Sequence, residues 1–426
     1  MSKESPPGER IAVVGGGVAG ITAAYLLQRR HEVLLFEAEP RLGGHAHTHE
    51  VPTEAGTLAV DSGFIVHNER TYPNLLRLFA ELGVRTQDSD MSMSVRCLGC
   101  GLEYAGGRRL AGLFPRWDNL IRPRYLRMLG EVTRFHRHAR RELAGPHGDP
   151  DRTLGEFVAA GGYTRYFVEH FLLPVVSAVW SAPERLSRAY PVRHLFRFMA
   201  HHGMLSVGGS PSWRTVTGGS RTYVERAVKH LTAVHVGTPV RAVRRHAGGV
   251  SVRDDADTEH QVDRVVLATH ADQALALLAD PTAAEREVLG AFSYSRNETW
   301  LHTDATLLPE SRGAAAAWNY LKPRCRGGAD RVLVSYDMNR LMRLDAVEPY
   351  VVTLGATDRV AADSVLARMR YEHPVYTPES VAAQRRLPEL AGPRTAYAGA
   401  YHGWGFHEDC CASGVRAATR FGSGWA

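Results

Sequence analysis

Four short apolar runs, two near the N-terminus and two far along the chain, predict buried parallel strands. Residues 11–14 (IAVV) and 33–36 (VLLF) are apolar without alternation, as in strands that are buried on both faces. Residues 18–30 between them have helical spacing, so this order predicts a βαβ unit. Two further apolar runs, at 265–269 and 396–399, predict strands that return to the same parallel sheet from far along the chain.

The middle of the chain is patterned differently. Residues 91–105 predict a hairpin, residues 110–202 have mostly helical periodicity and predict a cap, and alternating segments between 297 and 355 predict an antiparallel sheet. Shorter elements are expected as helices at 71–82, 220–231 and from 413 onward, and as strands at 234–236, 240–245 and 250–253. The fold class that follows is α/β: a Rossmann-like domain on a parallel sheet, and a second domain that combines an antiparallel sheet with a helical cap.

The composition narrows the class of protein. The chain has 426 residues and a net charge of +6, which suits two packed subdomains but is too weakly basic to indicate nucleic-acid binding. The charge suits an anionic cofactor, an anionic substrate or a membrane surface. The chain begins with polar residues and has no apolar run of transmembrane length. We therefore expect a cytoplasmic protein, with peripheral contact to the inner face of the membrane as an alternative; the sequence indicates no oligomeric state.

The five cysteines are unevenly spaced, which argues against a disulfide framework and agrees with a reducing cytoplasm. Cys97 and Cys100 have the CxxC spacing of metal and redox sites, but the second CxxC of a zinc site is missing. One of the 21 histidines could be recruited as a ligand from elsewhere. On balance the sequence predicts no metal site. Cys410 and Cys411 are adjacent and are expected to be unpaired.

A glycine-rich turn between the first strand and the first helix predicts a dinucleotide site. Residues 15–20 (GGGVAG) form a GxGxxG motif in the required strand–turn–helix context. Gly15 permits the tight turn, Gly17 lets the backbone approach a pyrophosphate, and Gly20 allows the helix to pack closely on the strand. The start of the helix, at Val18 and Ala19, offers backbone N–H groups to the phosphates. Glu37 ends the second strand, where a carboxylate accepts hydrogen bonds from a ribose hydroxyl.

The residues after Glu37 favour FAD over NAD. Residues 37–44 (EAEPRLGG) continue the motif with an arginine and a glycine pair, and here the chain resembles the flavin amine oxidase and phytoene desaturase superfamily, of the glutathione-reductase-2 type. The resemblance implies that FAD is bound non-covalently. It implies cofactor contacts from Glu37, Ala38, Arg41, Gly43, Gly44 and the following residue, His45. The superfamily usually has arginine where this chain has His45.

The resemblance continues at the C-terminus. Residues 398–401 (AGAY), 405–409 (GFHED) and 413–414 (SG) are similar to the final flavin motif of the superfamily. It implies that Gly399 lies near the ribityl chain, that a helix N-terminus points at the flavin pyrimidine, and that Phe406, His407 and Glu408 contact the cofactor. By the same resemblance, Val240 contacts the adenine and Ala268 lies at another crossing next to the cofactor.

A narrower likeness joins three further motifs. Residues 61–66 (DSGFIV), 318–320 (WNY) and 405–409 are similar to a bacterial branch of predicted flavin oxidoreductases, often linked with cyclopropane-fatty-acid-synthase-like methyltransferases. The branch usually has glycine where this chain has Cys410. The domain organisation expected from patterns and resemblance is an FAD-binding part at 1–90, a mostly helical substrate cap at 91–220, returning FAD-binding strands at 221–290, a substrate-domain sheet at 291–375 and an FAD-binding end at 376–426.

The likeness and the apolar cap favour an FAD-dependent oxidoreductase on an unsaturated or methyl-branched fatty-acyl chain, by hydride transfer to or from flavin N5. An amine oxidase and a redox-neutral double-bond isomerase are the alternatives. One dinucleotide motif is present, so no separate NAD(P)H domain is expected. The expected partner is a small apolar substrate, such as an acyl lipid.

Candidate catalytic residues flank the matched motifs. They are His67, Tyr320, His402 and Trp404, with Asn68, Tyr72 and Trp318 as further neighbours of the flavin. His67 and His402 have the pKa range of a general base. Many members of the superfamily use a lysine near flavin N5, and Lys322 is the candidate for that role here. Pro323 suggests that Lys322 lies in a loop, and we do not assign it.

Overall fold

The computed structural model describes residues 8–107, 109–145, 149, 151–206, 208–327 and 331–425. Its α/β fold confirms the predicted class. One part is built on a parallel sheet, which we call the nucleotide sheet, with the strand order β10-β2-β1-β14-β20. Its strands are β1 (Arg10–Val14), β2 (Glu32–Glu37), β10 (Ala233–Val236), β14 (Arg264–Leu267) and β20 (Thr395–Tyr397). The strands predicted to return from far along the chain are therefore in this sheet.

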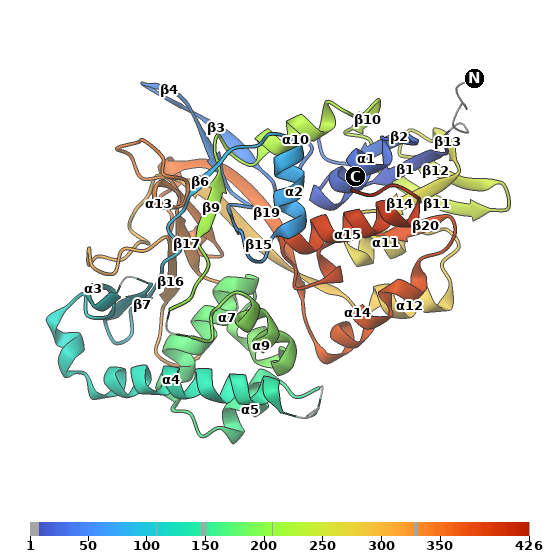
Figure 1. Cartoon of the computed structure of the whole chain (residues 1–426). Coiled ribbons are helices and arrows are strands. Elements are labelled where there is room, and N and C mark those ends of the chain that lie inside the picture. Colours follow the sequence, from blue (N-terminus) through green and yellow to red (C-terminus); the bar gives the residue numbers. More distant parts are fainter. Residues whose placement is uncertain are drawn as a thin grey trace.

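Helices cover the nucleotide sheet on both faces (Figure 1). Alternate residues of β1 face opposite sides: Ile11 and Val13 pack with α1 (Val18–Leu27) and α15 (His407–Arg420), and Ala12 and Val14 pack with the elements of the other face. That other face carries α11 (Ala271–Leu277), α12 (Ala283–Gly290), α14 (Pro378–Leu390) and a small sheet of β11 (Val240–His246), β12 (Gly249–Asp254) and β13 (Glu259–Val262). Both faces being covered explains why the strands are apolar without alternation.

A second, larger sheet has the order β19-β15-β18-β17-β16-β7-β8, and we call it the large sheet. Its strands are β7 (Met93–Cys97), β8 (Leu102–Gly106), β15 (Ser293–His302), β16 (Trp318–Lys322), β17 (Val334–Asp337), β18 (Val351–Leu354) and β19 (Val365–Val375), with α13 (Met338–Met342) between β17 and β18. The sheet is mixed, because β7 pairs with β16 in parallel and the other pairs are antiparallel. The hairpin predicted at 91–105 thus forms its edge, and β19, which lies beyond the alternating segments expected at 297–355, forms the other edge.

The helical cap lies under the large sheet and shares one apolar core with it (Figure 1). It contains α3 (Arg109–Leu113), a 3-10 turn at Trp117–Ile121, α4 (Pro123–Ala144), α5 (Leu154–Ala160), α6 (Arg165–Phe167), a π-helical turn at Val168–Leu172, α7 (Leu173–Trp180), α8 (Glu184–Ala189) and α9 (Val192–His201). Smaller elements join the two parts: the hairpin of β3 (Thr48–Thr53) and β4 (Gly56–Asp61), the sheet of β5 (Val66–Asn68), β9 (Trp213–Val216) and β6 (Thr86–Asp88), and the helices α2 (Pro73–Glu81) and α10 (Arg221–Val228). None of the helices in the described ranges combines the length and apolar character needed to cross a bilayer.

Candidate functional site

The glycine loop between β1 and α1 is tightly constrained by its neighbours. Gly15 has a φ of +106°, and a Cβ there would lie 2.6 Å from the carbonyl oxygen of Ala268, at the end of β14. A Cβ at Gly20 would lie only 1.9 Å from the carbonyl oxygen of Gly15. Both positions therefore require glycine for α1 to pack on the sheet, and Ala268 lies directly beside the loop.

Gly17, in contrast, faces open space. It precedes α1, and a Cβ built there would meet no described atom within 4 Å. The first turn of α1, with Val18 and Ala19, has backbone N–H groups that lack intrahelical acceptors. Open space in front of a helix N-terminus is the environment that a pyrophosphate needs.

The glycine pair after β2 lies directly on this first loop. The N–H of Gly43 donates to the carbonyl of Gly16 over 2.8 Å, and a Cβ at Gly44 would lie 3.2 Å from the Cα of Gly17. Near the pair, Arg41 Nη1 and His45 Nε2 are buried and have no hydrogen-bond partner within the described part of the chain. Buried polar atoms are rarely left without partners in native proteins, so these two indicate the place of a polar ligand.

The carboxylate of Glu37 is held against the glycine loop. Its Oε2 accepts from the N–H of Gly16 (2.7 Å) and its Oε1 from the N–H of Glu39 (2.8 Å). The turn after β10 joins this region, because the N–H of Thr238 donates to the carbonyl of Glu37 (2.8 Å). Val240 follows two residues later at the start of β11, and Ala38 is exposed at the rim. The residues matched to the adenine side therefore lie together.

The C-terminal motif forms a fixed loop in front of α15. The N–H of Gly399 donates to Ser413 Oγ (2.9 Å), and Asp409 Oδ2 accepts from the N–H groups of Trp404 and Phe406 (both 2.9 Å). Burial raises the pKa of Asp409 to about 7. The prediction that the last helix starts at Ser413 is wrong: α15 starts at His407, because the Asp409 carboxylate caps that earlier turn.

The side chains of His407 and Glu408 contact other residues of the protein. His407 stacks on Phe64 with 3.8 Å between ring centroids, and its Nε2 lies 2.7 Å from the hydroxyl of Tyr223. Glu408 accepts hydrogen bonds from the N–H groups of Asn74 (3.1 Å) and Leu75 (3.0 Å), at the start of α2. Their side chains therefore hold α15 against α2 and α10, and what the start of α15 offers a ligand is backbone N–H groups.

Three residues that the sequence did not single out lie beside the glycine pair. The ring of His45 is 4.9 Å from that of Tyr371 and 5.3 Å from that of His373, both on β19. Asn297 on β15 places its Nδ2 3.1 Å from Nδ1 of His373. Burial lowers the pKa of His373 to about 4, so the ring is neutral at physiological pH. The strand segments expected from the sequence ended at residue 355, so β19 was not anticipated as a strand at this edge of the large sheet.

The two histidines expected to act as bases are both buried. Burial lowers the pKa of His67 to about 4 and that of His402 to about 3. Both nitrogens of His67 and Nε2 of His402 have no hydrogen-bond partner among the described residues. Both rings are neutral at pH 7 but are weak bases, since a general base works best with a pKa near the working pH.

Trp404 and Phe406 connect the C-terminal loop to the cap. The Phe406 ring stacks on Phe198 of α9, with centroids 4.7 Å apart and an interplanar angle of 18°. The indole N–H of Trp180, at the end of α7, donates to the carbonyl of Trp404 (3.0 Å), and Trp404 stacks on His201. Aromatic side chains of the cap therefore lie directly on the loop that follows the last strand of the nucleotide sheet.

Tyr320 lies elsewhere. It is on β16, three strands from β15, which corresponds to about 14 Å across the sheet. Its hydroxyl donates to Glu184 (2.9 Å), and Lys322, two residues on, contacts both Glu169 (2.8 Å) and Glu184 (3.0 Å). The structure thus separates Tyr320 and Trp318 from the glycine loops, and Lys322 ends a strand rather than lying in a loop.

Comparisons with known proteins agree with this geometry. The family model described as flavin containing amine oxidoreductase matches residues 18–421. A protein of Mycobacterium tuberculosis named as a flavin-containing monoamine oxidase, AofH, is 29% identical over 258 residues, which cover 58% of this chain and 53% of AofH. The chain therefore matches about half the length of this curated relative.

Solved structures share the fold over almost the whole chain. Putrescine oxidase with bound putrescine has a TM-score of 0.69 at 14% identity and 96% coverage of this chain and 98% of its own. Cyclohexylamine oxidase of Brevibacterium oxydans scores 0.67 at 14% identity, with 97% and 99% coverage. A fatty acid isomerase of P. acnes that produces CLA scores 0.67 at 16% identity, with 98% and 100% coverage. At these identities the likeness establishes the fold alone.

Proposed function

The chain belongs to the flavin-containing amine oxidoreductase family, and on that basis we propose that it is an FAD-dependent oxidoreductase of an apolar, unsaturated or methyl-branched acyl substrate. FAD is the cofactor of the family, and the residues present fit it. Gly17 faces open space at a helix N-terminus, and Arg41 and His45 carry buried polar atoms without protein partners. When bound, the flavin supplies hydride exchange at N5.

The observation that carries the substrate class is the aromatic contact between the C-terminal loop and the cap. Phe198 lies against Trp180, His202, Trp404 and Phe406, so an apolar side of the site is formed jointly by α7, α9 and the loop. Burial lowers the pKa of His202 to about 4, which leaves this cluster uncharged at pH 7. Trp404 and Phe406 are the half-buried members of this cluster, and the uncharged aromatic face that they offer favours a hydrocarbon chain over a charged substrate.

The same residues give the amine-oxidase alternative less support. An aromatic cage needs two rings that face each other across a gap, whereas Phe198 and Phe406 stack directly at 4.7 Å and leave no gap. The name of the Mycobacterium tuberculosis relative favours an amine substrate, and the name of the P. acnes isomerase favours a redox-neutral reaction on a fatty acid. Both alternatives are therefore included in the test.

For any of these reactions, the chain's own residues bind, orient and keep the site dry. The glycine loops and the start of α15 offer N–H groups, and His45, His373 and His402 are neutral because burial lowers the pKa of each. None of these imidazoles is basic enough to remove a proton efficiently near pH 7. We therefore propose that they position the cofactor and substrate rather than act as bases.

The test is an anaerobic incubation of the purified holoenzyme with oleate, with its phospholipid ester, and with benzylamine. The proposal expects the flavin absorbance to bleach with the acyl substrates and the product mass to change by two hydrogens. Bleaching with benzylamine alone would establish the amine oxidase instead. An acyl product of unchanged mass but altered retention would establish the isomerase.

A substitution at the cap contact sharpens this test. We expect Phe198→Leu to raise KM for the acyl substrate several-fold while kcat changes less, because the buried Phe198 ring supports Trp404 and Phe406 from the cap side. Phe135→Leu is the matched control, since Phe135 is a buried ring that packs against other cap rings. Equal effects of the two variants on KM would contradict a role of Phe198 in supporting the substrate side of the loop.

We also propose that the start of the cap rests on an anionic membrane surface. Large apolar side chains are exposed along this segment: Leu110 (72%), Trp117 (75%), Leu120 (55%), Ile121 (66%) and Leu126 (42%). Arg116, Arg124 and Arg127 are exposed on the same segment, which lies at the edge of the molecule far from both termini (Figure 1). Exposed aromatic and aliphatic residues beside arginines suit the interface of an anionic bilayer, and such contact would give access to acyl lipids.

Vesicle flotation tests the membrane contact. We expect the protein to float with vesicles that contain phosphatidylglycerol and to float less as salt is raised. Trp117→Ser combined with Ile121→Ser should abolish flotation, whereas Leu366→Ser, at an exposed position of β19, should not. Flotation unaffected by the double substitution would rule out this surface.

A further inference from the structure

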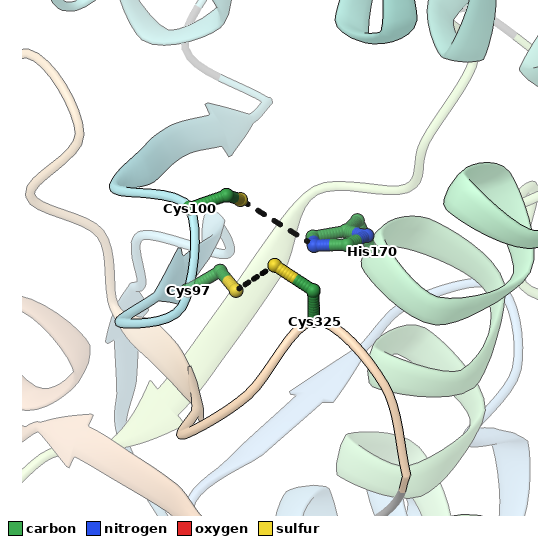
Figure 2. A group of neighbouring side chains, drawn as sticks. All are labelled: Cys97, Cys100, His170 and Cys325. Atoms are coloured by element: carbon green, nitrogen blue, oxygen red, sulfur yellow. Dashed lines mark hydrogen bonds between the residues drawn. The ribbon is translucent and has the colours of Figure 1, made fainter.

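Three cysteines and a histidine from distant parts of the chain converge at one corner of the molecule. Cys97 ends β7, Cys100 lies in the turn before β8, Cys325 lies in the loop after β16, and His170 is in the π-helical turn of the cap. One ligand atom of each lies within 4.8 Å of the ligand atoms of the other three. Figure 2 shows the four side chains pointing toward a common centre.

The spacing of these atoms matches a tetrahedral zinc site. Zn–S bonds of about 2.3 Å and Zn–N bonds of about 2.0 Å place tetrahedral ligands roughly 3.8 Å apart for two sulfurs and roughly 3.5 Å apart for sulfur and nitrogen. Cys97 Sγ and Cys325 Sγ are 3.7 Å apart, and Cys100 Sγ and His170 Nε2 are 3.6 Å apart. All the cysteines of the cluster are free thiols.

The histidine is held in the form that binds metals. Its Nδ1 lies 3.1 Å from the carbonyl oxygen of Tyr166, which requires the proton on Nδ1 and leaves the Nε2 lone pair toward the sulfurs. The Tyr166 ring stacks on the imidazole with 4.1 Å between centroids. A backbone acceptor on the second nitrogen is the usual support of a metal-binding histidine.

The cysteine turn has the backbone of a metal-binding loop. The N–H groups of Gly99 and Cys100 donate to the sulfur of Cys97, and the N–H of Leu102 donates to the sulfur of Cys100. Gly101 has a φ of +65° and closes the turn. A Cβ at Gly99 would lie 2.8 Å from the backbone nitrogen of Cys325, so glycine is needed there for the two cysteine segments to meet.

We propose that Cys97, Cys100, His170 and Cys325 bind one structural Zn²⁺ ion. Four protein ligands complete a tetrahedral shell with no open position, which is typical of a structural rather than a catalytic site. Binding releases the thiol protons to solvent, and three thiolates with neutral imidazole give a site of net charge −1. The ion joins the β7–β8 hairpin, the loop after β16 and the cap.

This site replaces the expectation that the chain binds no metal. That expectation rested on the missing second CxxC, and the structure supplies the two remaining ligands from His170 and Cys325, which lie 70 and 225 residues after Cys100. The site does not depend on the proposed substrate, and none of its ligands belongs to the flavin motifs.

The first test is the metal content of the reduced holoenzyme. Elemental analysis after gel filtration should find about one zinc per chain, either as purified or after reconstitution with Zn²⁺. Replacement by Co²⁺ should give the intense ligand-field bands of tetrahedral thiolate coordination, at wavelengths beyond the flavin absorption. Failure to retain Zn²⁺ in either preparation would overturn the proposal, as would a Cys97–Cys325 disulfide found by mass spectrometry in place of metal.

Variants test the ligand set. Cys325→Ser and His170→Gln should each lose most of the zinc and change the cobalt spectrum, with the FAD content retained. Cys410→Ser and His138→Gln are the matched controls outside the cluster and should keep zinc at the wild-type level. Should a ligand variant fail to fold, the cobalt spectrum of the wild-type protein still decides, because octahedral or absent coordination would contradict the assignment.

Discussion

The two candidate ligand sites of the molecule differ in how the chain forms them. We call the first, around the glycine loops, the glycine cradle and the second, around Cys97, Cys100, His170 and Cys325, the cysteine corner. The cradle is made by two nearby stretches of chain, 15–20 and 37–45, that pack on each other through backbone contacts. The corner is made by four side chains from three segments that only the large sheet and the cap bring together. A site formed by residues close together in the sequence can be recognised from their spacing. A site formed by residues that only the order of strands in a sheet brings together cannot.

The two regions also differ in whether their buried polar groups have partners within the protein. In the cradle, Arg41 and His45 have buried polar atoms without partners among the described residues. Beside the corner, the ammonium group of Lys322 is satisfied by Glu169 and Glu184. We expect the first region to be stabilised by FAD, and the second to be stabilised by its own charges and, in our proposal, by a metal.

The largest expected effect comes from breaking the buried charges beside the corner. Lys322→Met leaves Glu184 buried without its cation and leaves Glu169 with Arg188 as its remaining cation, which should lower the free energy of unfolding by about 3–5 kcal/mol. Denaturant unfolding of the holoenzyme measures it. Arg386→Met, at an exposed ion pair with Glu287, is the control and should leave stability unchanged. Similar losses in both variants would mean that burial does not determine how much these ion pairs contribute to the free energy of unfolding.

A smaller effect is expected at the cradle, on binding rather than folding. Gly17→Val places a side chain in the open space before α1, where overpacking costs about 1–3 kcal/mol. FAD affinity should fall by about 10- to 100-fold while circular dichroism stays unchanged. Gly130→Val, at an exposed glycine of α4 that also has open space, should keep FAD. Wild-type flavin content in Gly17→Val would place the pyrophosphate elsewhere.

The smallest effect is a pH dependence at the start of α15. Burial raises the pKa of Asp409 from near 4 to about 7, so the folded chain binds the proton more tightly than the unfolded chain. The contribution of Asp409 to the free energy of unfolding should therefore fall as pH rises from 4 to 7, by roughly 1–2 kcal/mol after the site relaxes. Asp409→Asn keeps an acceptor and removes the titration, so stability relative to wild type should rise across this window. A constant difference would show that Asp409 does not titrate there.

The cradle and the nucleotide sheet could be predicted from local signals. The apolar runs of β1, β2, β14 and β20 are long enough to identify, and the glycine spacing fixes the loop between them. The roles of Gly15 and Gly20 follow from backbone clearance, which depends on residues close in sequence or on an adjacent strand.

The rest depends on contacts that no local pattern contains. β19 lies outside the strand segments expected at 297–355, although it alternates apolar and charged residues from Ala367 to Glu372, and with it were missed Tyr371 and His373. The position of Tyr320, three strands from β15, could not be predicted because the order of strands in the large sheet cannot be read from the chain. The hydrogen bonds from α2 to Glu408 could not be predicted, because they join residues more than 300 positions apart.

Native mass spectrometry of the purified protein tests the distinction between the two regions most directly, because one spectrum weighs both ligands. The wild-type chain should carry one FAD and one zinc, Gly17→Val should keep zinc and lose FAD, and Cys325→Ser should keep FAD and lose zinc. A wild-type chain that carries neither ligand, or variants in which the two are always lost together, would contradict two separately built sites.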